Sequence, residues 1–295
     1  FKQTSWDGIG NNNTEGIVPP IGEGSRFMWI PQRAALRAVA VEAGSGKAGG
    51  GETMEADAND DLYIGQSSIA MGANASAWTY GVAIGYKVTA GRVSYQNEND
   101  NATRQRDINH IKDIAIGTNI DNRARQTIAI GHDISMRTSS TDPQDRGIAI
   151  GNSINGTQYD DTVSIGTDIS AYQGTHIGHD ITNTQGDNNT PNKSVSVGRN
   201  ITTSGGGVFV GSDGHATSGG VAVGSVGTEA SRAGVAVGRG VDASESAVAV
   251  GKGIDAGLSS VNIGRSNDTA EQGTAVGISN SAGSFGVAIG HSNST

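Results

Sequence analysis

A short alternation of aliphatic and small residues, closed by a glycine, recurs along most of the chain. The pattern aliphatic-small-aliphatic-Gly occurs fifteen times, and seven of the fourteen intervals between successive glycines are 13 residues. A period of two residues is typical of a β-strand, and thirteen residues are too few for a strand-helix-strand unit. The repeat therefore predicts a β-solenoid in which each repeat forms one coil and the longer intervals are loop insertions. The repeat glycines are Gly72, Gly85, Gly117, Gly131, Gly151, Gly166, Gly178, Gly198, Gly211, Gly224, Gly238, Gly251, Gly264, Gly277 and Gly290.

Two positions of each repeat carry large aliphatic side chains, one directly before the glycine and one three residues before it. They share one face of the predicted strand, because successive side chains of a strand point to opposite faces. Alanine stands between them in ten of the copies, so the other face is small. We predict that the structural core of the repeats includes Ile148, Ile150, Gly151, Val221, Val223, Gly224, Val248, Val250, Gly251, Val287, Ile289 and Gly290.

A second short strand is expected after each glycine, where Ile or Val recurs three residues further on, as at Ile120 and Ile134. Asp or Asn often stands between the two strands, as at Asp168 and Asp180. These side chains tolerate unusual backbone dihedrals and predict a tight turn. The same oxygens are suited to a hard cation such as calcium, but turn formation is the preferred interpretation, and no metal site or cofactor is expected.

So thin a coil has little interior in which to bury apolar side chains. Ordering its thirteen residues costs more free energy than burying about three aliphatic side chains per coil provides. We therefore expect apolar surface to be buried between chains as well, in a closed symmetric oligomer.

Repeats such as Gly147-Ile148-Ala149-Ile150-Gly151 and Gly220-Val221-Ala222-Val223-Gly224 resemble the YadA-like heads of trimeric autotransporter adhesins of Gram-negative bacteria. The resemblance covers about residues 62–295. It implies an all-β fold, a left-handed parallel β-roll with coils of about 13–15 residues, assembled as a homotrimer. It also implies display on the bacterial cell surface, at the outer membrane, with anchoring through segments outside this chain. Such heads attach cells to host matrix proteins, other cells or abiotic surfaces and are not enzymes.

The expected organisation is a cap segment and loop over residues 1–61, followed by head repeats over residues 62–295. Insertions are expected at about 86–113, 136–146 and 182–193. The end of a solenoid exposes unpaired strand edges, and a cap that includes Trp6, Phe27, Met28 and Trp29 would cover one of them.

Composition and charge narrow the range of functions. The chain has 46 Gly but only five Pro, which excludes collagen, and it has no Cys, which excludes disulfides and thiolate metal sites. A net charge of -9 disfavours nonspecific binding to nucleic acid or to anionic membranes, so no nucleic-acid partner is expected.

Two groups of residues are candidates for ligand binding. The first insertion contains Tyr95, Arg104 and Arg106, and loops on a rigid scaffold often carry binding, although a variable decoration explains it equally well. A basic column follows the glycine in later coils and could meet an acidic partner or protect the edge from aggregation. Its members are Arg199, Arg239, Lys252 and Arg265.

The segment His176-Ile177-Gly178-His179 resembles a nucleotide-binding signature of aminoacyl-tRNA synthetases. It falls in repeat register, without the alternating strands and helices that such a site needs, so we interpret it as one more repeat. No catalytic residue is predicted. The alternative function is a trimeric phage tail-fibre or tailspike β-solenoid module that binds polysaccharide.

Overall fold

The computed structural model describes residues 24–30, 34–41, 67–77, 80–91, 112–122, 126–137, 146–157, 161–184 and 193–295. All regular secondary structure in these ranges is β-strand, and no helix there could cross a membrane. The chain divides into two compact units, residues 1–151 and residues 152–295. The all-β prediction is therefore confirmed over the described part of the chain.

Most strands are 9 to 11 residues long, with shorter strands near the ends of the series. The first unit contains β1 (Gly24–Ile30), β2 (Ala35–Val41), β3 (Ile69–Ala73), β4 (Ser76–Ala77), β5 (Val82–Ala90), β6 (Ile114–Asn122) and β7 (Thr127–Arg137), and β8 (Gly147–Thr157) contains the division. The second unit contains β9 (Thr162–Ala171), β10 (Gly174–Thr184), β11 (Ser194–Ser204), β12 (Val208–Ala216), β13 (Val221–Ala230), β14 (Val235–Ala243), β15 (Val248–Ala256), β16 (Val261–Arg265), β17 (Asp268–Thr269), β18 (Thr274–Ile278), β19 (Ser281–Ala282) and β20 (Val287–His291).

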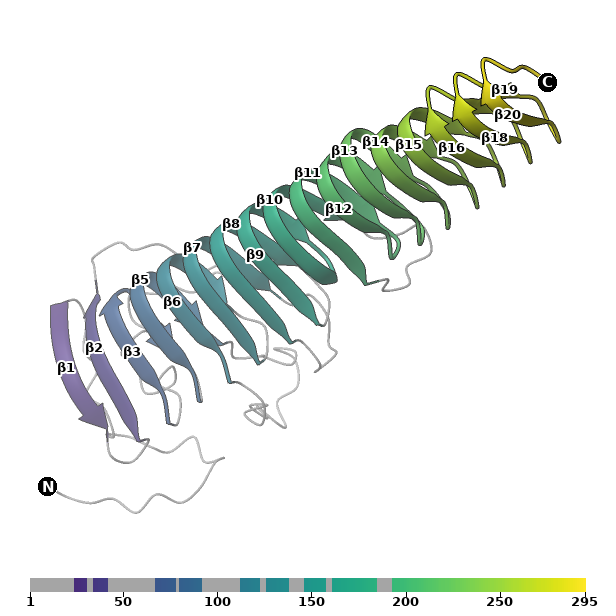
Figure 1. The fold of residues 1–295 in the computed structure, drawn as a ribbon. Helices are drawn as coiled ribbons and strands as arrows, with labels where there is room; N and C mark the ends of the chain where they lie inside the picture. The colour runs from purple at the N-terminus through teal and green to yellow at the C-terminus, as the bar shows by residue number, and fades with distance from the viewer. Residues whose placement is uncertain are drawn as a thin grey trace, which may run out of the picture. The chain divides into compact units, whose positions relative to one another are not determined.

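In the first unit, successive coils stack as parallel strands from β2 to β7 (Figure 1). Gly85 pairs with Gly117, and Gly117 pairs with Gly131, so the insertion between β5 and β6 leaves the register unchanged. Strand β1 runs antiparallel to β2, so the strand pair at that edge differs from the parallel pairs of the other coils. Its Met28 packs against Ile30 and Ala35.

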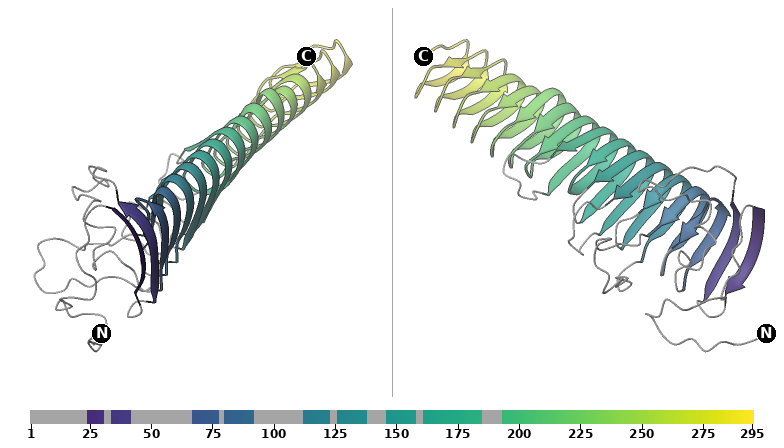
Figure 2. Two further views of the ribbon diagram at one scale, coloured as in Figure 1. Left: turned by 90° about the vertical axis from the view of Figure 1, so that its left-hand side faces the viewer. Right: turned by 180° about the vertical axis from the view of Figure 1, so that it is seen from behind.

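The second unit repeats the same parallel stacking from β9 to β20, as two further views show (Figure 2). Gly178 pairs with Gly166 on one side and with Gly198 on the other, across intervals of 12 and 20 residues. The predicted parallel β-solenoid is thus confirmed in each unit, with the longer intervals accommodated outside the ladder.

The repeat glycine is required by the close approach of neighbouring coils. A Cβ built on Gly178 would lie 1.7 Å from the carbonyl oxygen of Gly198, and the φ of Gly178 is +143°. Only glycine tolerates both the contact and this backbone conformation. The same obstruction, from the paired glycine of the next coil, recurs along both units, which explains why the column contains no other residue.

The turn predicted after each glycine is present. The residue two positions beyond the glycine has a left-handed φ, for example 53° at Asp168 and 52° at Asp180. In most coils one strand continues through this bend, whereas β16 and β17, or β18 and β19, are separate strands. The expectation of two strands in every coil is therefore correct only for the coils of β3 and β4, β16 and β17, and β18 and β19.

In most coils the interior is filled by the small residue two positions before the glycine and by an aliphatic residue three positions after it. Ala222 and Ala236 are 0% exposed, and Ile181 and Ile201 are 1% exposed. The predicted core was partly wrong: Ile150, Val223, Val287 and Ile289 lie on the outer face, and Ile148, Val221, Val248 and Val250 are half-buried. The chain folds with the alanine column inward because a coil this narrow cannot hold large side chains from both of its walls.

Phe209 shows how strictly the interior volume is controlled. This residue occupies the alanine position of its coil and is fully buried. Gly214 stands where the neighbouring coil has Ile201, and a Cβ on Gly214 would lie 2.2 Å from Cε2 of Phe209. The large ring and the missing side chain compensate each other within one coil.

Candidate functional site

The second unit exposes a long series of aliphatic side chains on its surface. The residues directly before the repeat glycines point outward and form an aliphatic column along successive strands, with exposed fractions such as 39% at Val210 and Val223. The residues three before the glycines form a second, more covered column beside it. We call these two columns the outer aliphatic face. The exposed members of the second unit are Ile165, Ile177, Val210, Val223, Val237, Val261, Ile263, Val287 and Ile289.

The first unit has the same outer aliphatic face, and it extends onto the antiparallel strand β1. Through β2, Phe27 lies in line with Met71, and Trp29 lies in line with Ile69. Both aromatic side chains are exposed, Phe27 by 77% and Trp29 by 59%. Phe27 and Trp29 of the predicted cap therefore extend the outer aliphatic face, while their strand β1 pairs with the edge of β2.

Contiguous apolar surface of this kind is rare on a monomeric soluble protein, which makes the outer aliphatic face a candidate interaction surface. Burial of the remaining two-fifths of each Val or Ile side chain would contribute about 0.6 to 1.2 kcal/mol, as a fraction of the value for full burial. The contribution would repeat at every coil of the outer aliphatic face.

The structure brings three of the four predicted basic residues together. Arg239, Lys252 and Arg265 pair in register on neighbouring strands, and none of them forms an ion pair with a described residue. Arg199 is separated from them by Ser212 and Ser225, and its Nη2 lies 3.7 Å from Oδ2 of Asp213. The predicted column is therefore a ladder of three residues, with Arg199 apart from it.

An acidic ladder that sequence reasoning missed runs along the same strands. Glu229, Asp242, Asp255 and Asp268 pair in register from β13 to β17. Burial, and then the neighbouring Asp255 and Glu229, raise the pKa of Asp242 above its usual value. The constant spacing of Asp242, Asp255 and Asp268, four residues after their glycines, was the signal available in the sequence. This surface is suited to basic groups and not to anions.

The two histidines of the His176-Ile177-Gly178-His179 segment lie in different environments. His176 is fully buried, with Nδ1 3.2 Å from Oγ of Ser196 and Nε2 3.3 Å from the carbonyl oxygen of Gln173. Burial lowers the pKa of His176 to about 4. His179 is exposed on the opposite side of the strand, so the two cannot act on one nucleotide, in agreement with the repeat interpretation.

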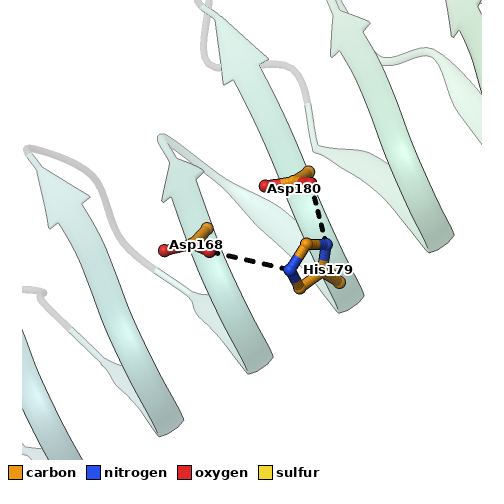
Figure 3. Close-up of side chains that lie close together, drawn as sticks. All are labelled: Asp168, His179 and Asp180. Atoms are coloured by element: carbon orange, nitrogen blue, oxygen red, sulfur yellow. Dashed lines mark ion pairs between the residues drawn. The ribbon is translucent and has the colours of Figure 1, made fainter.

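His179 belongs to a cluster with two carboxylates, Asp168 and Asp180 (Figure 3). Its Nδ1 lies 2.8 Å from Oδ2 of Asp180, and its Nε2 lies 3.7 Å from Oδ2 of Asp168 on the neighbouring strand. One potential ligand atom from each residue lies within 4.8 Å of the others. All three side chains are about half exposed, so solvent and ions can reach them.

The structure does not describe the predicted binding loop. Tyr95, Arg104 and Arg106 lie outside the described residues, as does Trp6 of the predicted cap. The candidate surfaces of the described chain are thus the outer aliphatic face, the two charged ladders and the His179 cluster.

Comparison with known proteins identifies no relative. No protein-family model matches the chain, and no curated protein or solved structure matches it.

Proposed function

We propose that this chain is the head of a homotrimeric bacterial surface adhesin that attaches cells to host matrix proteins, other cells or abiotic surfaces. The observation that carries the proposal is the outer aliphatic face. Each unit stacks its coils in register and leaves a continuous apolar strip unburied. Three parallel copies placed around one axis would bury these strips against one another.

The repeat motifs favour three chains and surface display, because they resemble those of YadA-like heads. A trimer also suits attachment, since three copies of every exposed column raise the effective concentration of weak contacts. The left-handed β-roll and the outer-membrane location belong to the same proposal. A phage tail-fibre module would share the oligomeric solenoid, and the attachment assay separates the two functions.

The first test changes the charge of the outer aliphatic face. Val210→Asp on β12 places a carboxylate in the column, whereas Thr202→Asp on β11 places the same group on an exposed position after the turn. In sedimentation experiments we expect the parent chain and Thr202→Asp to show three times the chain mass of 29.9 kDa. Val210→Asp should lose this assembly, because an unpaired charge is costly in an apolar interface. A folded parent chain that stays monomeric at micromolar concentration would contradict the proposal.

The second test concerns attachment. Cells that lack adhesins would display the chain fused to a trimeric anchor, and their binding to collagen, fibronectin, laminin, plastic and bacterial polysaccharide would be compared. Binding to matrix or plastic supports the adhesin. Binding to polysaccharide alone supports the phage-fibre alternative.

A further inference from the structure

At two places in this solenoid, neighbouring turns place an amide beside a carboxylate. Nδ2 of Asn119 donates to Oδ1 of Asp133 at 2.9 Å, and Nδ2 of Asn200 donates to Oδ1 of Asp213 at 2.9 Å. Asp168 and Asp180 occupy the corresponding turn positions of two successive coils, with no amide between them. Like charges at neighbouring positions of a ladder repel each other, so a cation bound between them would be stabilising.

The imidazole of His179 is oriented to share such a cation with Asp168. With Nδ1 protonated, the ring donates to Asp180 at 2.8 Å, which leaves the lone pair of Nε2 directed to the side of Asp168. The distance of 3.7 Å from Nε2 to Oδ2 of Asp168 is too long for a hydrogen bond. Two ligands bound at about 2.0 to 2.1 Å around a tetrahedral ion lie about 3.3 Å apart, so a small rotation of either exposed side chain suffices.

We propose that Asp168 and His179 bind a divalent transition metal ion such as zinc, while Asp180 orients the imidazole. A neutral imidazole nitrogen with carboxylate oxygens suits zinc and neighbouring metals, whereas calcium and magnesium prefer oxygen ligands alone. A carboxylate that accepts from the other ring nitrogen is the usual partner of a metal-binding histidine. The remaining coordination positions are open to water.

The first unit contains a natural counterpart that lacks one ligand. Gly131-His132-Asp133 repeats the sequence Gly178-His179-Asp180, and Nδ1 of His132 lies 3.0 Å from Oδ2 of Asp133. The neighbouring turn position there is Asn119, whose amide nitrogen cannot bind a metal in place of a carboxylate. The chain therefore offers both a loss-of-site variant and a gain-of-site variant.

The experiment is calorimetric titration of zinc chloride into the full chain in a buffer that does not bind zinc. We expect one zinc ion per chain for the parent protein. Asp168→Asn recreates the Asn-Asp pair found at Asn119 and Asp133, so it should fold normally, as circular dichroism would verify, and bind zinc at least about tenfold more weakly. Asn119→Asp completes the counterpart site and should raise the stoichiometry to two.

Absence of zinc binding by the parent chain would overturn the proposal and leave His179 as an ion-pair partner of the two carboxylates. Zinc binding that Asp168→Asn leaves unchanged would overturn it too, because the ion would then lie elsewhere. Failure of Asn119→Asp to add a second ion would refute the geometric argument. The inference is independent of the proposed adhesin, because the cluster lies within one chain and its test measures neither assembly nor attachment.

Discussion

Replacement of a single repeat glycine by alanine tests the argument that coil spacing depends on the absence of a side chain. In Gly238→Ala the new Cβ would lie 1.8 Å from the carbonyl oxygen of Gly251 and 3.0 Å from Cγ2 of Val241. In the control Gly253→Ala, the φ of +57° is also unfavourable for alanine, but no atom lies within 4 Å of the new Cβ. Both glycines belong to neighbouring strands of the second unit.

The expected magnitude follows from the contact. Real Cβ atoms are not found within 3.0 Å of such an oxygen, so the two coils must separate locally by about 1.2 Å at Gly238. Two or three ladder hydrogen bonds would be lost, each with a net value of about 1 kcal/mol. Backbone strain at the unusual φ adds about 1 to 3 kcal/mol. Gly238→Ala should therefore cost about 4 kcal/mol of unfolding free energy, against about 1 kcal/mol for Gly253→Ala.

The assay is guanidinium unfolding followed by circular dichroism, with both variants at the same chain concentration because the midpoint of an associating protein depends on concentration. The reasoning predicts a clearly lower midpoint for Gly238→Ala than for Gly253→Ala. Equal midpoints for the two variants would refute it, since backbone strain alone would then account for both.

Two further predictions concern the interior of the second unit. Phe209→Ala should lower the unfolding free energy by about 3 to 5 kcal/mol. In a double-mutant cycle, adding Gly214→Ile should recover part of that loss. Additive effects of the two substitutions would show that the positions are not coupled. Burial lowers the pKa of His176 from 6.5 to about 4, so between these pH values the unfolded chain binds a proton that the folded chain does not. The contribution of the neutral imidazole to the unfolding free energy is present in full above pH 6.5. The unfolding free energy falls by up to about 3 kcal/mol as the pH approaches 4. The variant His176→Ser copies Ser164 and Ser196 of the adjacent coils. It should remove this pH-dependent loss from unfolding curves measured between pH 4 and 6.5. An unchanged pH profile would argue against a neutral buried imidazole.

The charged surfaces show where sequence reasoning succeeds and where it stops. Arg239, Lys252 and Arg265 were found from their constant offset after the glycine, and the register confirms that they are neighbours. The acidic ladder has a similarly constant offset in Asp242 and Asp255, but the sequence does not show that the second half of the coil stacks as closely as the first. Contacts such as that between His179 and Asp168 depend on which coil lies beside which, across an interval that varies along the chain.

The sequence alone determined the β-solenoid, the coil length and the turns, because a period of two residues, a recurring glycine and Asp or Asn at the bend are local signals that need no knowledge of distant contacts. The tertiary structure decided which side of each strand faces inward. A period of two distinguishes the two faces of a strand but does not say which face is buried, and the narrow interior admits the alanine column and excludes the larger side chains of Val223 and its equivalents. That choice leaves the aliphatic columns outside, where they can serve as an interface.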